Sequence, residues 1–273
     1  MSNTRRPRNP QLGKEPAPRA TALIVSLVVL LCIGAVVAIA VLLKGGGDDN
    51  TAAGSPGTPT LSQSTTAPST ADQSTGPVDT GLDCSAAPPT PGDTQKYDNP
   101  PPKTLAGDAT WTATLKTNCG DIVMELNGKA APQTVSSFVF LAQKHFFDES
   151  PCHRLVTAGI YVLQCGDPTG TGSGGPGYGF GIENAPADGR YPTGTVAMAR
   201  TQDPNSNGSQ FFLVYRNSQL PTDGGGYSIF GRVTKGLDIL TGLAKGGSDN
   251  SNGSGDGHPN QPISILSVTV KKG

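Results

Sequence analysis

Apolar and polar residues alternate along the chain from Trp111 onward. Residues 111–115 read WTATL, and residues 122–126 read IVMEL after a short turn at 118–120. Alternation with a period of two is typical of strands that bury one face. The pattern therefore predicts an antiparallel hairpin at the start of a β-rich domain.

The same reasoning predicts further strands and two helices. A helix is expected from Pro132 because apolar residues then recur at helical spacing as far as Phe146, and proline suits a first helical turn. A one-residue shift of the apolar phase at Leu266-Ser267 predicts a bulge in the last strand. Strands are expected at 195–200, 209–215, 227–233 and 263–270, and a second helix at 237–245. Together these elements predict a mainly β fold, a closed antiparallel barrel with a helix covering each end.

Four cysteines follow the apolar N-terminal region and predict two disulfides. If the hairpin between 152 and 165 turns at Ala158-Gly159, Cys152 and Cys165 are cross-strand neighbours within disulfide reach. Cys84 and Cys119 then remain to pair with each other. Because no C-x-x-C motif occurs, zinc binding and thioredoxin-like chemistry have no support.

Residues 20–43 form an uncharged apolar run that follows a basic tail over residues 1–19. This run is long enough to cross a bilayer core of ~30 Å as a helix, and it is longer than the apolar part of a signal peptide. The charges predict a single-pass membrane anchor with a cytoplasmic N-terminus and an extracytoplasmic domain. Cleavage at Ala40 and lipid attachment at Cys32 remain as alternatives.

Much of the excess glycine and proline lies between the apolar run and the strands. The chain has 37 Gly and 24 Pro, and residues 44–106 are rich in Gly, Ser, Thr and Pro. Such a segment buries too little apolar surface to offset its ordering entropy. We expect a disordered linker over 44–106, attached to the domain through Cys84, and a folded domain over 107–273.

Charge and motif content exclude several classes of function. The net charge is −1, which gives no electrostatic reason to expect a nucleic-acid partner. The three histidines, His145, His153 and His258, show no metal-ligand spacing, so no metal is expected. Residues 170–175 match G-x-G-x-x-G, but further glycines and Pro176 follow them, which indicates a loop rather than a dinucleotide site.

Several short motifs occur in a fixed order that resembles one known family. They are His153-Arg154, Q-C-G-D at 164–167, G-G-P-G-Y at 174–178, Met198-Ala199, N-G-S-Q-F-F at 207–212 and I-F-G-R-V at 229–233. In this order they resemble the cyclophilin family of peptidyl-prolyl cis-trans isomerases, over about residues 112–270. The resemblance implies a closed eight-stranded barrel capped by two helices, and it does not extend to the first hundred residues.

The resemblance also implies a mechanism and a set of site residues. Amide rotation faces a barrier of ~18–20 kcal/mol, and the twisted state leaves a localised lone pair on the prolyl nitrogen that can accept a hydrogen bond. Arg154 is expected to donate that bond, with Gln164 and Phe212 as its catalytic partners. Substrate-binding residues are expected to be Tyr161, Val162, Ala199, Arg200, Gln210, Leu220 and Tyr227. No cofactor is implied, the expected partners are proline-containing polypeptides, and we expect a monomer.

The sequence departs from the usual family pattern at the edge of the expected proline pocket. Tyr161-Val162 stands where the family usually has Phe-Met, Tyr227 where it commonly has His, and Gln219 where a Trp is common. The loop at 221–226 is longer and glycine-rich. We expect activity with a shifted sequence preference and weak cyclosporin binding.

Two other classes of function stay open from the sequence. The domain could hold proline-containing segments without accelerating their isomerisation, which the altered pocket edge allows. A nucleotide-binding role for the glycine-rich loop has less support, because no strand and helix flank it in a βαβ unit. A measured rate of X-Pro isomerisation distinguishes such a binding domain from an enzyme.

Overall fold

The computed structural model describes residues 79–273. The basic tail, the predicted membrane anchor at 20–43, and linker residues 44–78 lie outside the described residues. Among the helices that are described, none combines the length and the apolar character that a bilayer crossing requires. The predicted anchor therefore stays a prediction.

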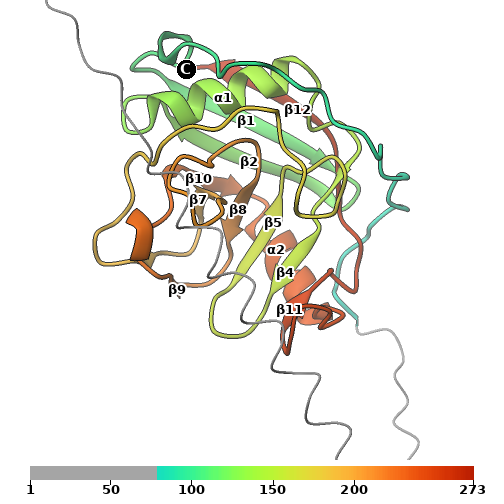
Figure 1. Ribbon diagram of the computed structural model, residues 1–273. Helices are drawn as coiled ribbons and strands as arrows, with labels where there is room; N and C mark the ends of the chain where they lie inside the picture. The colour runs from blue at the N-terminus through green and yellow to red at the C-terminus, as the bar shows by residue number, and fades with distance from the viewer. Residues whose placement is uncertain (1–78) are drawn as a thin grey trace, which may run out of the picture. The chain divides into compact units, whose positions relative to one another are not determined.

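Most strands belong to one antiparallel sheet, in the order β11-β4-β5-β8-β7-β10-β2-β1-β12-β3 (Figure 1). Its strands are β1 (Thr110–Thr117), β2 (Gly120–Asn127), β3 (Ser150–Pro151), β4 (Arg154–Val156), β5 (Val162–Cys165), β7 (Thr195–Met198), β8 (Phe211–Val214), β10 (Ile229–Lys235), β11 (Asp256–Gly257) and β12 (Ser264–Lys272). A separate pair consists of β6 (Arg190–Tyr191) and β9 (Ser218–Gln219). The mainly β prediction is confirmed, and each predicted strand is present within a few residues.

The predicted closure into an eight-stranded barrel is wrong. The strand order has two free ends, β11 and β3, and the main sheet has ten strands. The ends come near each other through the chain itself, because β3 pairs with β12 and β4, just after it, pairs with β5. After β3, Cys152 N still donates to Ile263 O at 2.9 Å, and pairing with β5 begins only at Arg154. The two ends of the order, β11 and β3, do not pair with each other, so the sheet is curved but open.

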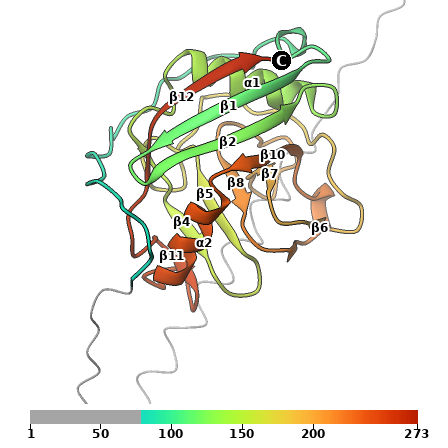
Figure 2. The same cartoon turned by 180° about the vertical axis from the view of Figure 1, so that it is seen from behind.

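Two helices complete the main core. Helix α1 (Pro132–Gln143) packs against β12, and α2 (Leu237–Gly246) packs against β2 (Figure 2). Both helices contribute to the same core, with Phe138 and Leu141 from α1 and Leu240 and Leu243 from α2. Two short 3-10 helices, η1 (Lys103–Leu105) and η2 (Asp223–Gly225), lie in connecting segments. The two predicted helices are confirmed, as is the predicted bulge, because the β1–β12 register skips Leu266.

Both predicted disulfides are present, although the hairpin register differs from the prediction. Cys152 and Cys165 are bonded, with Cα atoms 4.0 Å apart, and Cys84 is bonded to Cys119. Arg154 pairs with Gln164, so the turn centres on Gly159 rather than on the 158–159 bond. Gly159 adopts a φ of 77°, a conformation that glycine takes without a steric penalty. Cys152 lies before β4 begins, so its disulfide does not require exact pairing.

Residues 79–106 pack on the domain, which corrects the expectation of disorder for this part of the linker. Besides the Cys84–Cys119 bond, Ser85 N donates to Asn118 O at 2.9 Å, and Tyr97 N donates to Pro176 O at 2.7 Å. Tyr97 also packs edge-on against Phe140, with ring centroids 4.9 Å apart. The disulfide, hydrogen bonds to the domain and apolar contacts of Leu82, Leu105 and Ala106 with the main core order a segment whose composition alone predicts disorder. We call residues 79–106 the strap.

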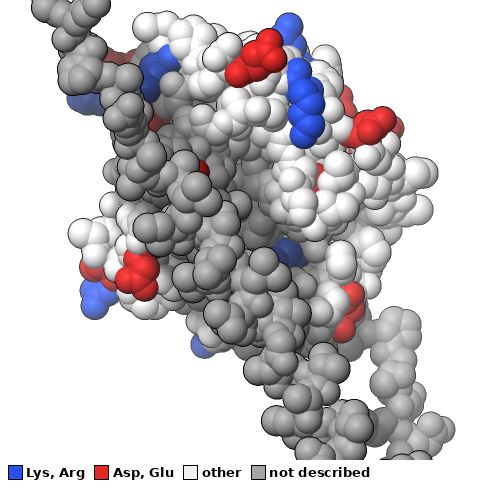
Figure 3. All heavy atoms as spheres, in the orientation of Figure 1, with Lys and Arg blue, Asp and Glu red and all other residues white. Residues whose placement is uncertain are grey.

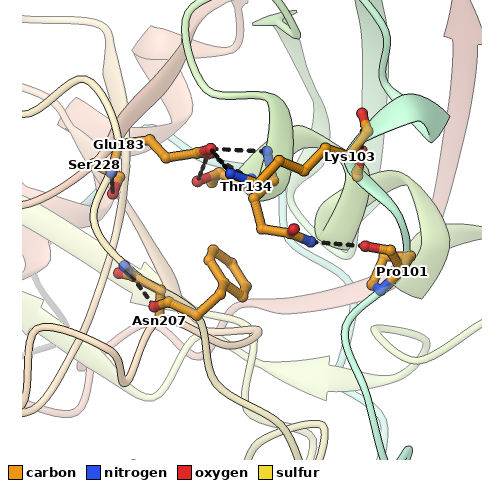
Figure 4. Close-up of polar contacts among 9 residues, drawn as sticks. Pro101, Lys103, Thr134, Glu183, Asn207 and Ser228 are labelled. Carbon is orange, nitrogen blue, oxygen red and sulfur yellow. Dashed lines mark hydrogen bonds and ion pairs between the residues drawn. The ribbon is translucent and has the colours of Figure 1, made fainter. Parts of the chain in front are cut away.

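The N-terminus of α1 is capped by a residue from a distant loop. Its own N-cap residue, Ala131, has no capping side chain. Instead, the Glu183 carboxylate accepts hydrogen bonds from Gln133 N at 3.1 Å and from Thr134 N and Oγ1, both at 2.9 Å (Figure 4). Ser228 Oγ in turn accepts from Glu183 N at 2.9 Å. This carboxylate, only 14% exposed, therefore fixes the loop before β6 to the first turn of α1, where the helix dipole favours a negative charge.

We expect Glu183→Gln to lower the free energy of unfolding by about 2 kcal/mol, because hydrogen bonds to a charged acceptor are replaced by bonds to a neutral amide. Glu125→Gln is the matched control. Glu125 forms an exposed ion pair with Arg232, so we expect its loss to cost about 0.5 kcal/mol. Denaturant unfolding of both variants measures the difference. Equal effects would show that the Glu183 cap contributes no more than a surface ion pair.

Candidate active site

Four residues on neighbouring strands form a row across one face of the sheet. Arg154 on β4 pairs with Gln164 on β5, Gln164 pairs with Phe212 on β8, and Phe212 pairs with Ala197 on β7. Paired residues on antiparallel strands point to the same side of a sheet. The register therefore places the predicted arginine, glutamine and phenylalanine side by side.

The two faces of these strands bury different apolar groups. Phe211 belongs to the main core, whereas Phe212 belongs to a separate cluster on the other face. We call this second group the outer cluster; it contains Val156, Val162, Tyr191, Ala197, Phe212, Val214 and Leu220, with Ile160, Ala199, Tyr227 and Ile229 half-buried at its margin. Alternation along β8 explains the division, since consecutive residues point to opposite faces.

Asp256 holds the Arg154 side chain at the end of the row. Arg154 Nε donates to Asp256 Oδ1 at 2.8 Å, and Nη2 donates to Oδ2 at 2.6 Å. This two-point pair raises the pKa of Arg154 and lowers the pKa of Asp256, mainly through the hydrogen bonds between them. Nη1 stays outside the pair and donates one bond, to Gln164 Oε1 at 3.3 Å. A permanently charged guanidinium with a spare N–H is thus fixed beside the outer cluster.

Gln164 connects the arginine to the glycine-rich loop. Its Nε2 donates to Gln210 Oε1 at 2.9 Å. Gln210 Nε2 then donates to the backbone oxygens of Gly172 and Gly174, each at 2.9 Å. The orientation of both amides follows from this chain of donors and acceptors. The polar row therefore runs without interruption from Asp256 to the glycine-rich loop.

Aromatic rings surround Phe212 at the far end of the row. Tyr227 lies edge-on to Phe212, with centroids 5.8 Å apart, and Tyr191 lies 6.2 Å from Phe212. The Tyr191 hydroxyl donates to Tyr227 O at 2.9 Å and accepts from Tyr227 N at 2.8 Å. The Arg200 guanidinium lies over the Tyr227 ring, 4.9 Å from its centroid. These contacts hold Tyr227 at the margin of the outer cluster.

Most of the sequence-predicted site residues lie together, and one does not. Val162, Phe212 and Leu220 are in the outer cluster, Ala199 and Tyr227 are at its margin with Arg200 over the Tyr227 ring, and Arg154, Gln164 and Gln210 form the polar row. Tyr161 lies elsewhere: it directly precedes β5 and packs on the main core, whereas Val162 belongs to the outer cluster. Its ring packs instead under Arg216, 4.3 Å from the guanidinium carbon, and packs on the main core.

Sequence reasoning missed two residues of the site, Asp256 and Tyr191. Asp256 lies in a polar stretch, SDNSNGSGDG at 248–257, with no pattern that distinguishes it from its neighbours. Tyr191 lies on a two-residue strand, too short to show an alternation. The sequence did offer one indication of Asp256. A guanidinium at a proposed catalytic position needs a carboxylate or amide to orient it, so an acidic partner for Arg154 could have been expected.

His153 lies beside the site but is not part of its hydrogen-bond network. The residue is 8% exposed, and neither ring nitrogen has a hydrogen-bond partner among the described residues. Burial lowers the pKa of His153 below its ordinary value of 6.5, with Asp167 partly opposing the shift and His258 and Arg154 adding to it. We therefore describe His153 as a neutral buried ring.

The Asp167 carboxylate holds the glycine-rich loop in place through hydrogen bonds. Asp167, which is buried, accepts hydrogen bonds from Thr169 N at 2.8 Å and from Gly174 N at 2.9 Å. No helix follows the loop before β6. Within residues 79–273, no group of three or more His, Cys, Asp or Glu side chains is arranged to hold a metal ion. The loop thus serves as an acceptor for Gln210 and as one wall of the site.

The described surface on this side of the molecule is hollowed (Figure 3). In the part of this view that the described residues occupy, most acidic and basic side chains lie toward the margin, and a basic side chain lies near the centre. A concave surface with a few fixed polar groups is the usual form of a small-ligand or peptide site.

Comparisons with known proteins agree with this geometry. Residues 112–270 match the family described as "Cyclophilin type peptidyl-prolyl cis-trans isomerase/CLD". The chain is 42% identical over 205 residues to a probable peptidyl-prolyl cis-trans isomerase B of Mycobacterium leprae, covering 70% of this chain and 67% of the relative. It is 40% identical over 136 residues to a peptidyl-prolyl cis-trans isomerase of Helicobacter pylori, covering 49% and 80% of the two chains.

A solved structure is similar over the same region. The crystal structure of a cyclophilin-type isomerase from Cryptosporidium parvum has a TM-score of 0.51 and 31% identity, covering 60% of this chain and 99% of that one. A second structure of the C. parvum protein, with 32% identity and a TM-score of 0.51, was solved in the presence of the dipeptide Ala-Pro and covers 59% of this chain and 99% of its own.

The state of His153 predicts an acid-sensitive fold. Because the folded-state pKa lies below the unfolded value, the unfolded chain binds more protons as the pH falls through about 6.5, so stability is lost on the acid side. We expect the free energy of unfolding of the parent to fall between about pH 7.5 and about pH 5 by more than that of His153→Leu. Denaturant titrations at several pH values measure both slopes. Identical slopes would contradict a neutral buried imidazole.

Proposed function

Because the chain belongs to the cyclophilin-type peptidyl-prolyl cis-trans isomerase family, we propose that Arg154 accelerates rotation about X-Pro bonds without forming a covalent bond to the client. The observation that carries the proposal is the row from Asp256 through Arg154 and Gln164 to Phe212. In this row a hydrogen-bond donor lies beside the apolar side chains of the outer cluster.

The chemistry follows from what changes during amide rotation. The planar amide delocalises its nitrogen lone pair, whereas the half-rotated amide leaves that pair localised. A donor aimed at this nitrogen binds the twisted state better than either planar isomer, and only such differential binding accelerates the step. Arg154 suits this role because it stays protonated and because Asp256 occupies Nε and one N–H of Nη2. Nη1 remains available to the client.

The remaining groups hold the client while one part of it turns. We propose that the proline ring packs on Phe212, Val162 and Leu220 of the outer cluster. The amides of Gln164 and Gln210, with the Ala199 backbone, would bind the flanking peptide groups, and Arg200 would keep Tyr227 in place. Ala-Pro, the dipeptide present with the C. parvum relative, is the smallest X-Pro unit and supports this class of substrate.

We also propose that the domain acts outside the cytoplasm, at a membrane. The apolar run at 20–43 and the basic residues before it support a single-pass anchor with its N-terminus in the cytoplasm. The two disulfides of the domain support an oxidising compartment. The clients would then be exported polypeptides that contain proline.

Replacing Arg154 tests the mechanism. We expect Arg154→Ala to lower kcat/KM of the full chain on a short Ala-Pro peptide by about 100-fold, the usual effect of losing one transition-state donor. Arg154→Lys, which keeps the charge but loses the planar fork, should lose about tenfold. Arg216→Ala is the control, since this arginine packs on Tyr161 outside the site. Exchange spectroscopy on the peptide measures each rate.

A parent chain that binds the peptide yet leaves its exchange rate unchanged would favour a proline-segment binding module instead. Equal losses in Arg154→Ala and Arg216→Ala would mean that neither arginine acts at the amide.

Asp256 is a positioning residue in this proposal, and its replacement has a distinct signature. We expect Asp256→Asn to lower kcat about tenfold, because the neutral amide no longer fixes the guanidinium, while KM changes little. Asp238→Asn on α2, an exposed aspartate away from the site, should leave both constants unchanged. The kcat and KM of both variants on the Ala-Pro peptide measure the difference. An increase in KM with kcat unchanged would show that Asp256 serves client binding rather than the orientation of Arg154.

A further inference from the structure

A groove of about 540 Å³ lies next to the polar row, on the side away from Asp256. Gln164 and Gln210, which belong to the row, line one of its walls, and Ala199 lines it as well. The glycine-rich loop at 172–177 forms another wall. A client that lies over Gln164 and Gln210 with its proline on Phe212 therefore continues into this groove.

The strap adds a cation to the edge of the groove. Lys96 lines it, and its Nζ donates to Gly175 O at 2.7 Å. The neighbouring strap residues are fixed to the same loop, because Thr94 Oγ1 donates to Gly175 O at 3.3 Å and Tyr97 N donates to Pro176 O at 2.7 Å. The ammonium therefore lies at a defined place on the groove edge, with two further N–H donors directed elsewhere.

The charges that line the groove are all positive and have no carboxylate partner. Lys96 and Arg200 are its charged lining residues, and none of the lining residues is Asp or Glu. Among residues 79–273, no carboxylate lies within ion-pair distance of either cation, although Arg154, the third cation nearby, is paired with Asp256. Arg200 donates to the backbone oxygens of Gly226, Thr201 and Asp223, which fixes its position without neutralising its charge.

We propose that Lys96 of the strap makes this groove select an acidic side chain of the client. The inference rests on the proposed function, since it uses the same client path. Phe212 and Gln210 are two residues apart along the chain, a span of ~7 Å in extended backbone. An extended client therefore enters the groove about two positions from the proline, and a Glu side chain there can extend toward Lys96 at the groove edge.

The test compares peptides and variants of the full chain. Four proline peptides carry Glu or Gln two positions before, or two positions after, the proline. At low salt we expect Glu to be favoured over Gln in kcat/KM by about threefold at one of the two positions, the usual size of an exposed ion pair. The preference should disappear in Lys96→Gln and reverse in Lys96→Glu. It should also weaken as salt is raised.

Matched controls separate this inference from the proposed function. Lys116→Gln on β1 changes the net charge equally but lies outside the groove, so it should keep the Glu preference. Each variant is compared with the parent through the ratio of its kcat/KM on the Glu and Gln peptides, so a change in the rate common to both peptides does not enter the test. A Glu preference unchanged by Lys96→Gln, or absent at both positions in the parent, would overturn the subsite. A parent inactive on every peptide would overturn the proposed function itself.

Discussion

The bond between a guanidinium and a carboxylate is the constraint on which the site depends. A free arginine side chain samples many rotamers, and each hydrogen bond that it makes to a client must first order it. In this chain Asp256 accepts from two of the guanidinium nitrogens and leaves Nη1 directed along the row to Gln164. The ordering cost is met during folding rather than at each encounter with a client.

The register of the sheet places this ion pair next to the apolar side chains of the outer cluster. With the turn centred on Gly159, Arg154 is opposite Gln164 and shares a face with Phe212. A shift by one residue would place Arg154 opposite Leu163, whose side chain belongs to the main core, and would separate the donor from the apolar surface. Gly159, which adopts the positive φ of this turn, therefore contributes to the placement of the row.

Local patterns predicted the strands, both helices, the bulge and the two disulfides, because each depends on neighbouring residues or on simple hairpin geometry. They did not predict contacts between distant segments. Asp256 reaches Arg154 from 102 positions away and lies in a stretch without periodicity. Tyr161 was assigned to the site by the family resemblance alone, and its ring packs on the main core. The closure of the sheet was wrong, since it depends on whether the two end strands, β11 and β3, pair with each other, and they do not.

The strap shows why composition alone placed the start of the folded domain at residue 107, although residues 79–106 also pack on it. Its Gly, Ser, Thr and Pro content shows no periodic apolar face, so the sequence pattern does not predict its order. Most of the hydrogen bonds that it donates to the domain go to backbone oxygens, including those of Asn118, Gly175 and Pro176. The Gly175 and Pro176 oxygens belong to the loop whose Gly172 and Gly174 oxygens orient Gln210. A segment with the composition of a tether thus contacts the same loop whose oxygens orient Gln210, so residues 94–97 and the polar row share one support.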